Sequence, residues 1–543
     1  MNARFLCWLV AVLPLLAVVG WAALAPDLPE PASTRQALGE MATVWTFDEW
    51  LRDGGGPLHL AARALHLAAL EVPGATARSV LWLNVVCVLW LASSLATVAR
   101  RAFSEEVVGR GAALVWLFVF GLLVASPGYG SNWLHAERVG VFLAPALLVT
   151  GIGWLQVGGR FPLRAGGVVV IAGLAPLCHA NGMATALALI PALMARCRVS
   201  VSVRAVAWLG ALLVVGNLAS WFALRTAPSF GAADADLFAH ISRAPREMAA
   251  RILTETGAAW LDLVPTSTLD EHALGLLSWT LPLLLLLPVG RRDEEALARS
   301  GPWWSCLVFG LAVTAVAAVR YELSPPVGTT REAVYGAFLL PLGTIGLLAI
   351  RFGAALLPFA AGALVVLGIA DWHAGLEDLR RARVRAAVAA ARLVAAPSGV
   401  RAVYGDPSRL DALVARGVVP LPSRVEAQRF ADVGSPRAEL GRVTRVSSGE
   451  LRGEVFSSLR GATAAWLVAV VEAPGATATL AATCWPDYAG AGRVVPWSLE
   501  LPQPLAAGAQ VRVAAWLPEE GAVAAIGPRY RVRGGALVVD DGT

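Results

Sequence analysis

Apolar residues fill long uninterrupted runs of this chain, and eleven such runs precede residue 371. A helix needs roughly 20 apolar residues to cross a hydrocarbon core about 30 Å thick, and many of the runs approach that length. The pattern predicts a polytopic α-helical membrane protein with about eleven transmembrane helices in residues 1–371. The runs cover residues 5–25, 77–98, 111–126, 139–157, 165–178, 181–195, 205–224, 273–290, 302–319, 333–350 and 354–370.

The first run follows Arg4 and extends over residues 5–25, which is longer than the apolar part of a usual secretory signal. Because further runs follow, we expect an uncleaved first helix.

The pattern changes beyond residue 371. Residues 372–396 form a charged helical stretch that we expect to link two domains, and Pro397-Ser398-Gly399 ends it. From about residue 440, short alternating segments are separated by turns that contain glycine or proline, which is typical of a β-sandwich. We therefore predict a mainly β domain over residues 397–543.

Composition agrees with membrane insertion. Of the 543 residues, 57% are hydrophobic and 15% are charged, whereas a soluble protein carries about a quarter charged residues. The net charge is +5, but the arginines are scattered over loops and no separate basic domain is evident, so we expect no nucleic-acid partner. The six cysteines form no Cys-x-x-Cys pair, so neither a zinc site nor a disulfide framework is expected.

Arginine gathers in every second loop, and basic residues favour the cytoplasmic side. These loops are 100–110, 159–164, 196–204, 291–299 and 351–353. The N-terminus is then cytoplasmic, and the region after 371 is extracytoplasmic, in a multi-pass protein of the cytoplasmic (inner) membrane. The predicted outer segments are 26–76, 127–140, 178–182, 225–272 and 320–336.

These outer segments hold the candidate chemistry. Asp48 and Glu49 lie between aromatic residues in the stretch FDEW, and the amphipathic run 54–72 follows them. Such a run is expected to lie at the membrane surface, where it would hold the carboxylates near lipid head groups.

Further short motifs follow in order: LWLNVVCVL with Asn84, NWLHAER with His135, Glu137 and Arg138, the tight turn CHANG with His179, and Arg320-Tyr321. The acidic pair and this order of motifs, over residues 1–371, resemble the GT-C superfamily of membrane glycosyltransferases. That superfamily includes the protein mannosyltransferases and lipid A aminoarabinose transferases, and the resemblance is strongest to a poorly characterised bacterial branch.

The resemblance implies inverting transfer of a sugar from a polyprenyl-phosphate donor to a glycan, lipid or protein acceptor outside the cytoplasm. Asp48 would be the general base, and Glu49 would assist or hold a divalent metal ion. Arg138 and Arg320 would bind the donor phosphate. His135, Glu137, His179 and Tyr321 would line the site.

Simpler interpretations stay open for these residues. Arg320 also fits a snorkelling arginine at the interface, and Arg138 fits a partner of Glu137. Two features depart from the family: the turn after His179 lacks a carboxylate, and the Gly-Gly element continues as PLHL without a basic residue. The departures allow a divergent acceptor or a scaffold that no longer transfers sugar.

Two other functions compete with sugar transfer. A transporter usually carries ionisable residues within its spans and internal repeats, neither of which is evident here. A non-catalytic membrane protein could instead display the β-rich domain as a binding module.

Overall fold

The computed structural model describes most of the chain, and the account below concerns these residues. They are 3–23, 60–70, 72, 77–102, 110–134, 138–157, 160–197, 203–226, 245–261, 271–286, 294–323, 335–352, 357–395, 430, 436–447, 449–457, 463–484, 486, 494–517 and 522–540. The chain divides into two compact units, one mainly Val80–Gly375 with shorter N-terminal stretches and the other mainly Leu376–Thr543.

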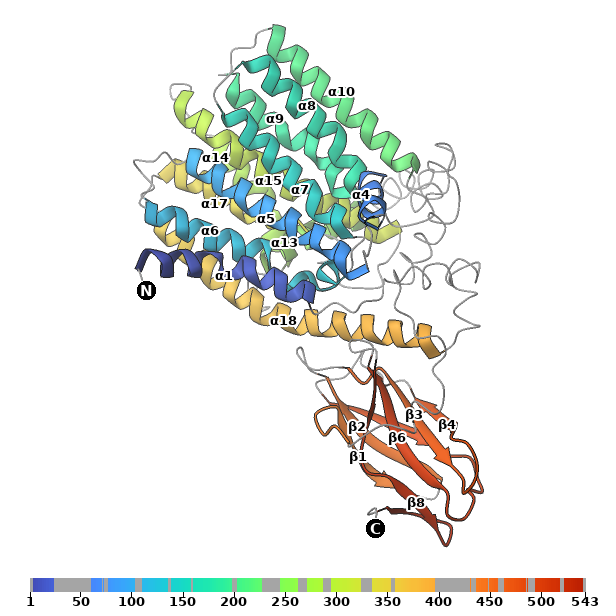
Figure 1. The fold of residues 1–543 in the computed structure, drawn as a ribbon. Coiled ribbons are helices and arrows are strands. Elements are labelled where there is room, and N and C mark those ends of the chain that lie inside the picture. Colours follow the sequence, from blue (N-terminus) through green and yellow to red (C-terminus); the bar gives the residue numbers. More distant parts are fainter. Residues whose placement is uncertain are drawn as a thin grey trace. The chain divides into compact units, whose positions relative to one another are not determined.

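The first unit is a bundle of helices that lie side by side (Figure 1). Its α-helices are α1 (Ala3–Ala23), α4 (Leu60–Leu70), α5 (Ala77–Ala102), α6 (Arg110–Val124), α7 (Val139–Gln156), α8 (Phe161–Cys178), α9 (Thr185–Arg196), α10 (Val203–Thr226), α13 (Pro245–Leu261), α14 (Glu271–Leu286), α15 (Glu294–Leu323) and α17 (Leu339–Phe352). Two 3-10 turns, η1 (Pro127–Trp133) and η3 (Ala180–Ala184), interrupt the chain at helix ends. The long helix α18 (Leu357–Ala395) runs from this unit into the second.

Each of the eleven apolar runs coincides largely with a helix, so the helical part of the prediction is confirmed. Among the residues that the structure describes, six helices are long and apolar enough to cross a membrane, within α5, α7, α8, α10, α15 and α18. Three more apolar stretches, Val10–Ala23, Leu114–Tyr129 and Leu339–Phe352, are shorter. The count of eleven spans, and the side on which each loop lies, stay predictions.

Small residues allow the helices of the bundle to approach closely, as in many membrane proteins. A Cβ added to Gly343 on α17 would lie 2.5 Å from the backbone nitrogen of Leu307 on α15. One added to Gly346 would lie 2.2 Å from the indole of Trp303, which is itself buried. At these two positions α17 therefore packs directly on the backbone and the indole ring of α15.

The second unit contains two antiparallel sheets. One has the strand order β1-β2-β5, and the other has the order β4-β3-β6-β8-β9 with β7 also paired to β6. The strands are β1 (Gly441–Val446), β2 (Glu450–Phe456), β3 (Trp466–Glu472), β4 (Thr479–Cys484), β5 (Val494–Glu500), β6 (Gln510–Leu517), β7 (Ala522–Ala525), β8 (Tyr530–Arg533) and β9 (Ala536–Val539). The predicted β-rich region is thus confirmed as sheet.

The two sheets share one hydrophobic core. Inward residues of the smaller sheet, such as Leu451 and Trp497, pack with Val511 and Val513 of the larger one. On β5, buried and exposed residues alternate at every position, as expected of a strand with one face toward a core. The arrangement is a β-sandwich.

Candidate functional site

Three parts of the chain meet at Gly140, in the first turn of α7. A Cβ added there would lie 2.0 Å from the carbonyl oxygen of Cys178, at the end of α8, and 3.0 Å from the Cβ of Ala62 on α4. Ala62 is 1% exposed. Because α4 lies in the amphipathic run 54–72 that follows Asp48 and Glu49, the contact brings that run to the ends of two bundle helices.

Arg138 precedes this junction. It is half-buried and occupies the residue before α7, with φ −79° and ψ 4°. At that position the chain enters the first turn of α7, where the helix dipole favours an anion. The last residue of the motif NWLHAER therefore lies at the N-terminus of α7.

His179 lies across the junction, immediately after Cys178. Its ring Nδ1 accepts a hydrogen bond of 3.2 Å from the backbone nitrogen of Asn181, so the imidazole caps η3. The side chain of Asn181 donates to the carbonyl oxygen of Tyr335 at 3.2 Å and is buried. A Cβ on Gly182 would lie 1.9 Å from the carbonyl of Ala175, which explains the small residue in this turn.

The C-terminal end of α6 lies in the same part of the bundle. Four aromatic side chains from other segments donate to carbonyl groups in its last turn or in the two residues that follow it, Ala125 and Ser126. The bonds are Trp372 Nε1 to Leu122 O (2.7 Å), Tyr335 Oη to Val124 O (3.0 Å), Trp21 Nε1 to Ala125 O (3.1 Å) and Trp133 Nε1 to Ser126 O (2.8 Å). The end of α6 is thus held by α1, η1, α18 and the turn before α17.

Aromatic rings continue this packing. Tyr335 lies edge-on to Tyr129, with centroids 4.7 Å apart, and to Phe142, at 4.6 Å. Asn84 on α5 donates to the carbonyl oxygen of Asn132 at 3.3 Å. Four motifs picked out from the sequence, around Asn84, Trp133, His179 and the segment before α17, are therefore in one cluster.

The remaining candidate residues are described less fully. Asp48, Glu49, His135 and Glu137 lie outside the described residues. Arg320 and Tyr321 belong to the last turn of α15, and their side chains are outside the description too. Their roles stay predictions.

Polar residues that the sequence did not single out are also buried in the bundle. Asp371 is 2% exposed on α18, and Glu255 is 4% exposed on α13, where its Oε1 lies 3.3 Å from Arg251 Nε. Thr256 bonds Thr314 of α15 at 3.0 Å. Both carboxylates lie in segments that also carry several other charged residues, so composition gave no reason to expect burial.

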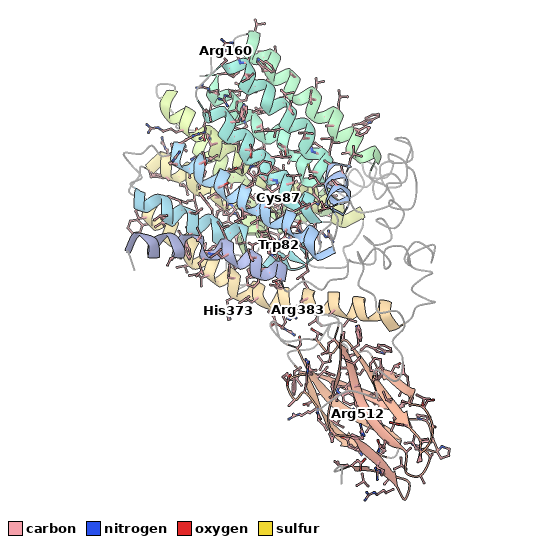
Figure 2. The ribbon with its side chains drawn as sticks, in the orientation of Figure 1. Trp82, Cys87, Arg160, His373, Arg383 and Arg512 are labelled. Atoms are coloured by element: carbon pink, nitrogen blue, oxygen red, sulfur yellow. The ribbon has the colours of Figure 1, made fainter. Side chains whose placement is uncertain are left out.

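Among the described residues, no three His, Cys, Asp or Glu side chains are grouped so as to hold a metal ion. Glu49, the predicted ligand of a divalent ion, lies outside that part of the chain. Arg160, labelled in Figure 2, precedes α8 and Cys178 ends that helix, so Arg160 is separate from the cluster around Gly140.

Comparison of the chain with family models, with curated proteins and with solved structures gives no match.

Proposed function

We propose that the protein is a membrane glycosyltransferase that moves a sugar from a polyprenyl-phosphate donor to an acceptor outside the cytoplasm. The contact at Gly140 is the observation that supports this function best. It joins the helix after the Asp48 loop to the segments of Arg138 and His179, in a bundle whose helices are apolar enough to insert in a membrane.

The chemistry follows from the groups available. The acceptor hydroxyl oxygen attacks the anomeric carbon as the bond from that carbon to the phosphate oxygen breaks, with inversion. Asp48 accepts the hydroxyl proton. The leaving polyprenyl phosphate carries the electron pair, and Arg138 and Arg320 stabilise its charge as guanidinium–phosphate contacts do.

The other candidates complete the site. Glu49 supports the loop or binds a divalent ion, and His135, Glu137, His179 and Tyr321 line the region between donor and acceptor. His179 accepts a backbone hydrogen bond from Asn181 through Nδ1, and this bond orients its ring.

A second candidate is a non-catalytic protein that displays its β-sandwich. This function is favoured by the second unit, which has a hydrophobic core of its own. Such a protein would not depend on Asp48.

The test is turnover of labelled polyprenyl-phosphate sugars by membranes that contain equal amounts of native chain, Asp48→Asn or Glu49→Gln. General-base assistance is worth about 10²–10⁴-fold in rate, so Asp48→Asn should lower transfer by about that factor. Glu49→Gln should cost less or introduce a metal requirement.

Asp378→Asn is the matched control, because Asp378 lies in the second unit, where it forms an ion pair with Arg381 of the same helix at 3.9 Å. It should leave transfer unchanged. Full activity of Asp48→Asn would rule out the mechanism, and an inactive native chain across all donors would favour the display function.

A further inference from the structure

Two arginines from different helices reach consecutive residues of α7, at the end of that helix opposite Gly140. Nη1 of Arg101, in the last turn of α5, donates to the carbonyl oxygen of Gly153 at 3.0 Å. The guanidinium group of Arg164, in the first turn of α8, lies 4.7 Å from the ring centroid of Trp154. The C-terminal ends of α5 and α7 and the N-terminal end of α8 therefore meet through basic side chains.

Trp154 packs against α8 and is still open to its surroundings. A Cβ added to Gly167 on α8 would lie 3.1 Å from the indole Nε1, so the ring lies directly on that helix. Trp154 is nevertheless 40% exposed. A half-exposed tryptophan beside an arginine at a helix end is typical of the level at which lipid head groups meet the hydrocarbon core. The contact between the cation and the ring also helps to orient the guanidinium group.

The charge of this region is positive. Helices α5, α7 and α8 contain no Asp or Glu. The stretches 100–110 and 159–164 carry five arginines against two glutamates, both outside the described residues, so their net charge is +3. Arg101 is exposed, as is Arg160, which directly precedes α8 one turn before Arg164. A partner of this surface should therefore be anionic.

An apolar surface continues from these charges along α8. Leu163, Val170 and Leu174 are all exposed. They recur at helical spacing and share one face of the helix. Gly167 lies between Leu163 and Val170 on this face, so the ring of Trp154 borders it. A soluble anion would use only the charges, whereas a phospholipid would use both the charges and the apolar face.

We propose that Arg101, Arg160 and Arg164 bind the head-group phosphate of an anionic phospholipid, whose acyl chains lie on the exposed face of α8 beside Trp154. Guanidinium groups form strong charge-assisted hydrogen bonds with phosphate, and basic sites between helix ends suit anionic lipids. The proposal does not require any arginine to lack other partners, because a guanidinium group has five N–H donors. It is also independent of sugar transfer, because these residues lie at the ends of α7 and α8 opposite Gly140 and Cys178.

Photo-crosslinking of the full-length protein in phosphatidylcholine nanodiscs tests the proposal. One sample contains phosphatidylglycerol with a diazirine near the start of an acyl chain, and the other contains phosphatidylcholine with the same diazirine. Mass spectrometry after pepsin digestion measures labelling of residues 153–174. The site variants are Arg101→Gln, Arg160→Gln and Arg164→Gln. Arg196→Gln is the matched control, because it removes the same charge from an exposed position at the end of α9.

In the native chain the phosphatidylglycerol probe should label this region more strongly than the phosphatidylcholine probe. Each site variant should lower that difference by about fivefold, the effect expected when one arginine is removed from an anionic membrane surface. Arg196→Gln should leave it unchanged. Arg160→Gln guards against a folding failure of the other two variants, because Arg160 is exposed and precedes the helix.

Equal labelling of this region by the two probes in the native chain would overturn the proposal, and the basic surface would then serve a different anionic partner. An equal loss in Arg196→Gln would also overturn it, because the lipid would then respond to the total charge rather than to this site. Unchanged labelling in all three site variants would do the same.

Discussion

At Gly140 the first turn of α7 touches the carbonyl oxygen of Cys178 and the methyl group of Ala62. A side chain there must move backbone, which typically costs about 1–3 kcal/mol in a packed interior. Gly140→Ala should therefore lower the melting temperature of the full chain in nanodiscs. Gly210→Ala is the matched control, since nothing lies within 4 Å of its added Cβ, and it should leave stability equal or raised. Equal melting of both variants and the native chain would show that α4, α7 and α8 do not meet this closely.

Glu450 on the sheet surface gives a pH-dependent contact. Hydrogen bonds from Arg452 and Ser498 lower the pKa of its carboxyl group below the ordinary value. Because the folded-state pKa is the lower one, the stabilisation is present above the ordinary carboxyl pKa and is lost as pH falls through the lowered pKa.

We therefore expect Glu450→Gln to reduce the loss of stability on acidification, by a small amount because the pair is on the surface. Melting of native and variant chains between neutral and acidic pH measures this. Identical pH dependence in the two would mean that the Glu450 hydrogen bonds do not form in solution.

Several residues of the candidate cluster could be identified from the sequence and others could not. The sequence alone marks His179 and Asn181, because they lie in a tight polar turn between two apolar runs. Asp371 resembled the first charge of a helix leaving the membrane, and its burial depends on Ser126, some 245 positions away. Pairings over such separations are set by tertiary packing and leave no local pattern.

At the scale of elements, α18 belongs to both units. In its C-terminal part Val384 and Ala387 are 1% and 0% exposed and enter the two hydrophobic clusters of the β region. Arg380 bonds Ser457 at 2.5 Å and forms an ion pair with Glu377. The sequence correctly predicted a helix here, but periodicity alone did not reveal that it packs on strands.

We expect a fragment of residues 376–543 to give a β-type circular dichroism spectrum with some helix and a cooperative melt. A fragment of residues 397–543, the predicted domain, lacks Val384 and Ala387 and should melt at a lower temperature, because both hydrophobic clusters then lose a buried aliphatic side chain. Equal melting of the two fragments would show that α18 contributes nothing to this core.

At the scale of the whole molecule, the ends of several helices meet in one cluster. The cluster contains the C-terminal ends of α6 and α8, the turn η1, the N-terminal end of α7 and the turn before α17. Hydrogen bonds of Asn84, Asn181 and Tyr335 join these segments. The predicted outer segments 127–140, 178–182 and 320–336 all contribute to it. The sequence could predict that these segments lie on one side of the bundle, because antiparallel neighbouring helices return every second loop to the same side.

The most direct test of this account asks whether the Asp48 loop reaches the cluster on the outer face. In the double variant Glu49→Cys/Glu137→Cys, a short bis-maleimide should link positions 49 and 137 within one chain. A membrane-impermeant thiol reagent added first to intact cells should prevent the link. The control variant Glu49→Cys/Arg160→Cys places its second thiol at the other end of α8 and should give no link. Mass spectrometry of digested protein identifies the joined peptides despite the native cysteines. A 49–137 link that the impermeant reagent blocks is the predicted result. A link between positions 49 and 160 would contradict the shared outer site. So would a 49–137 link that the impermeant reagent blocks only when the cells have been broken.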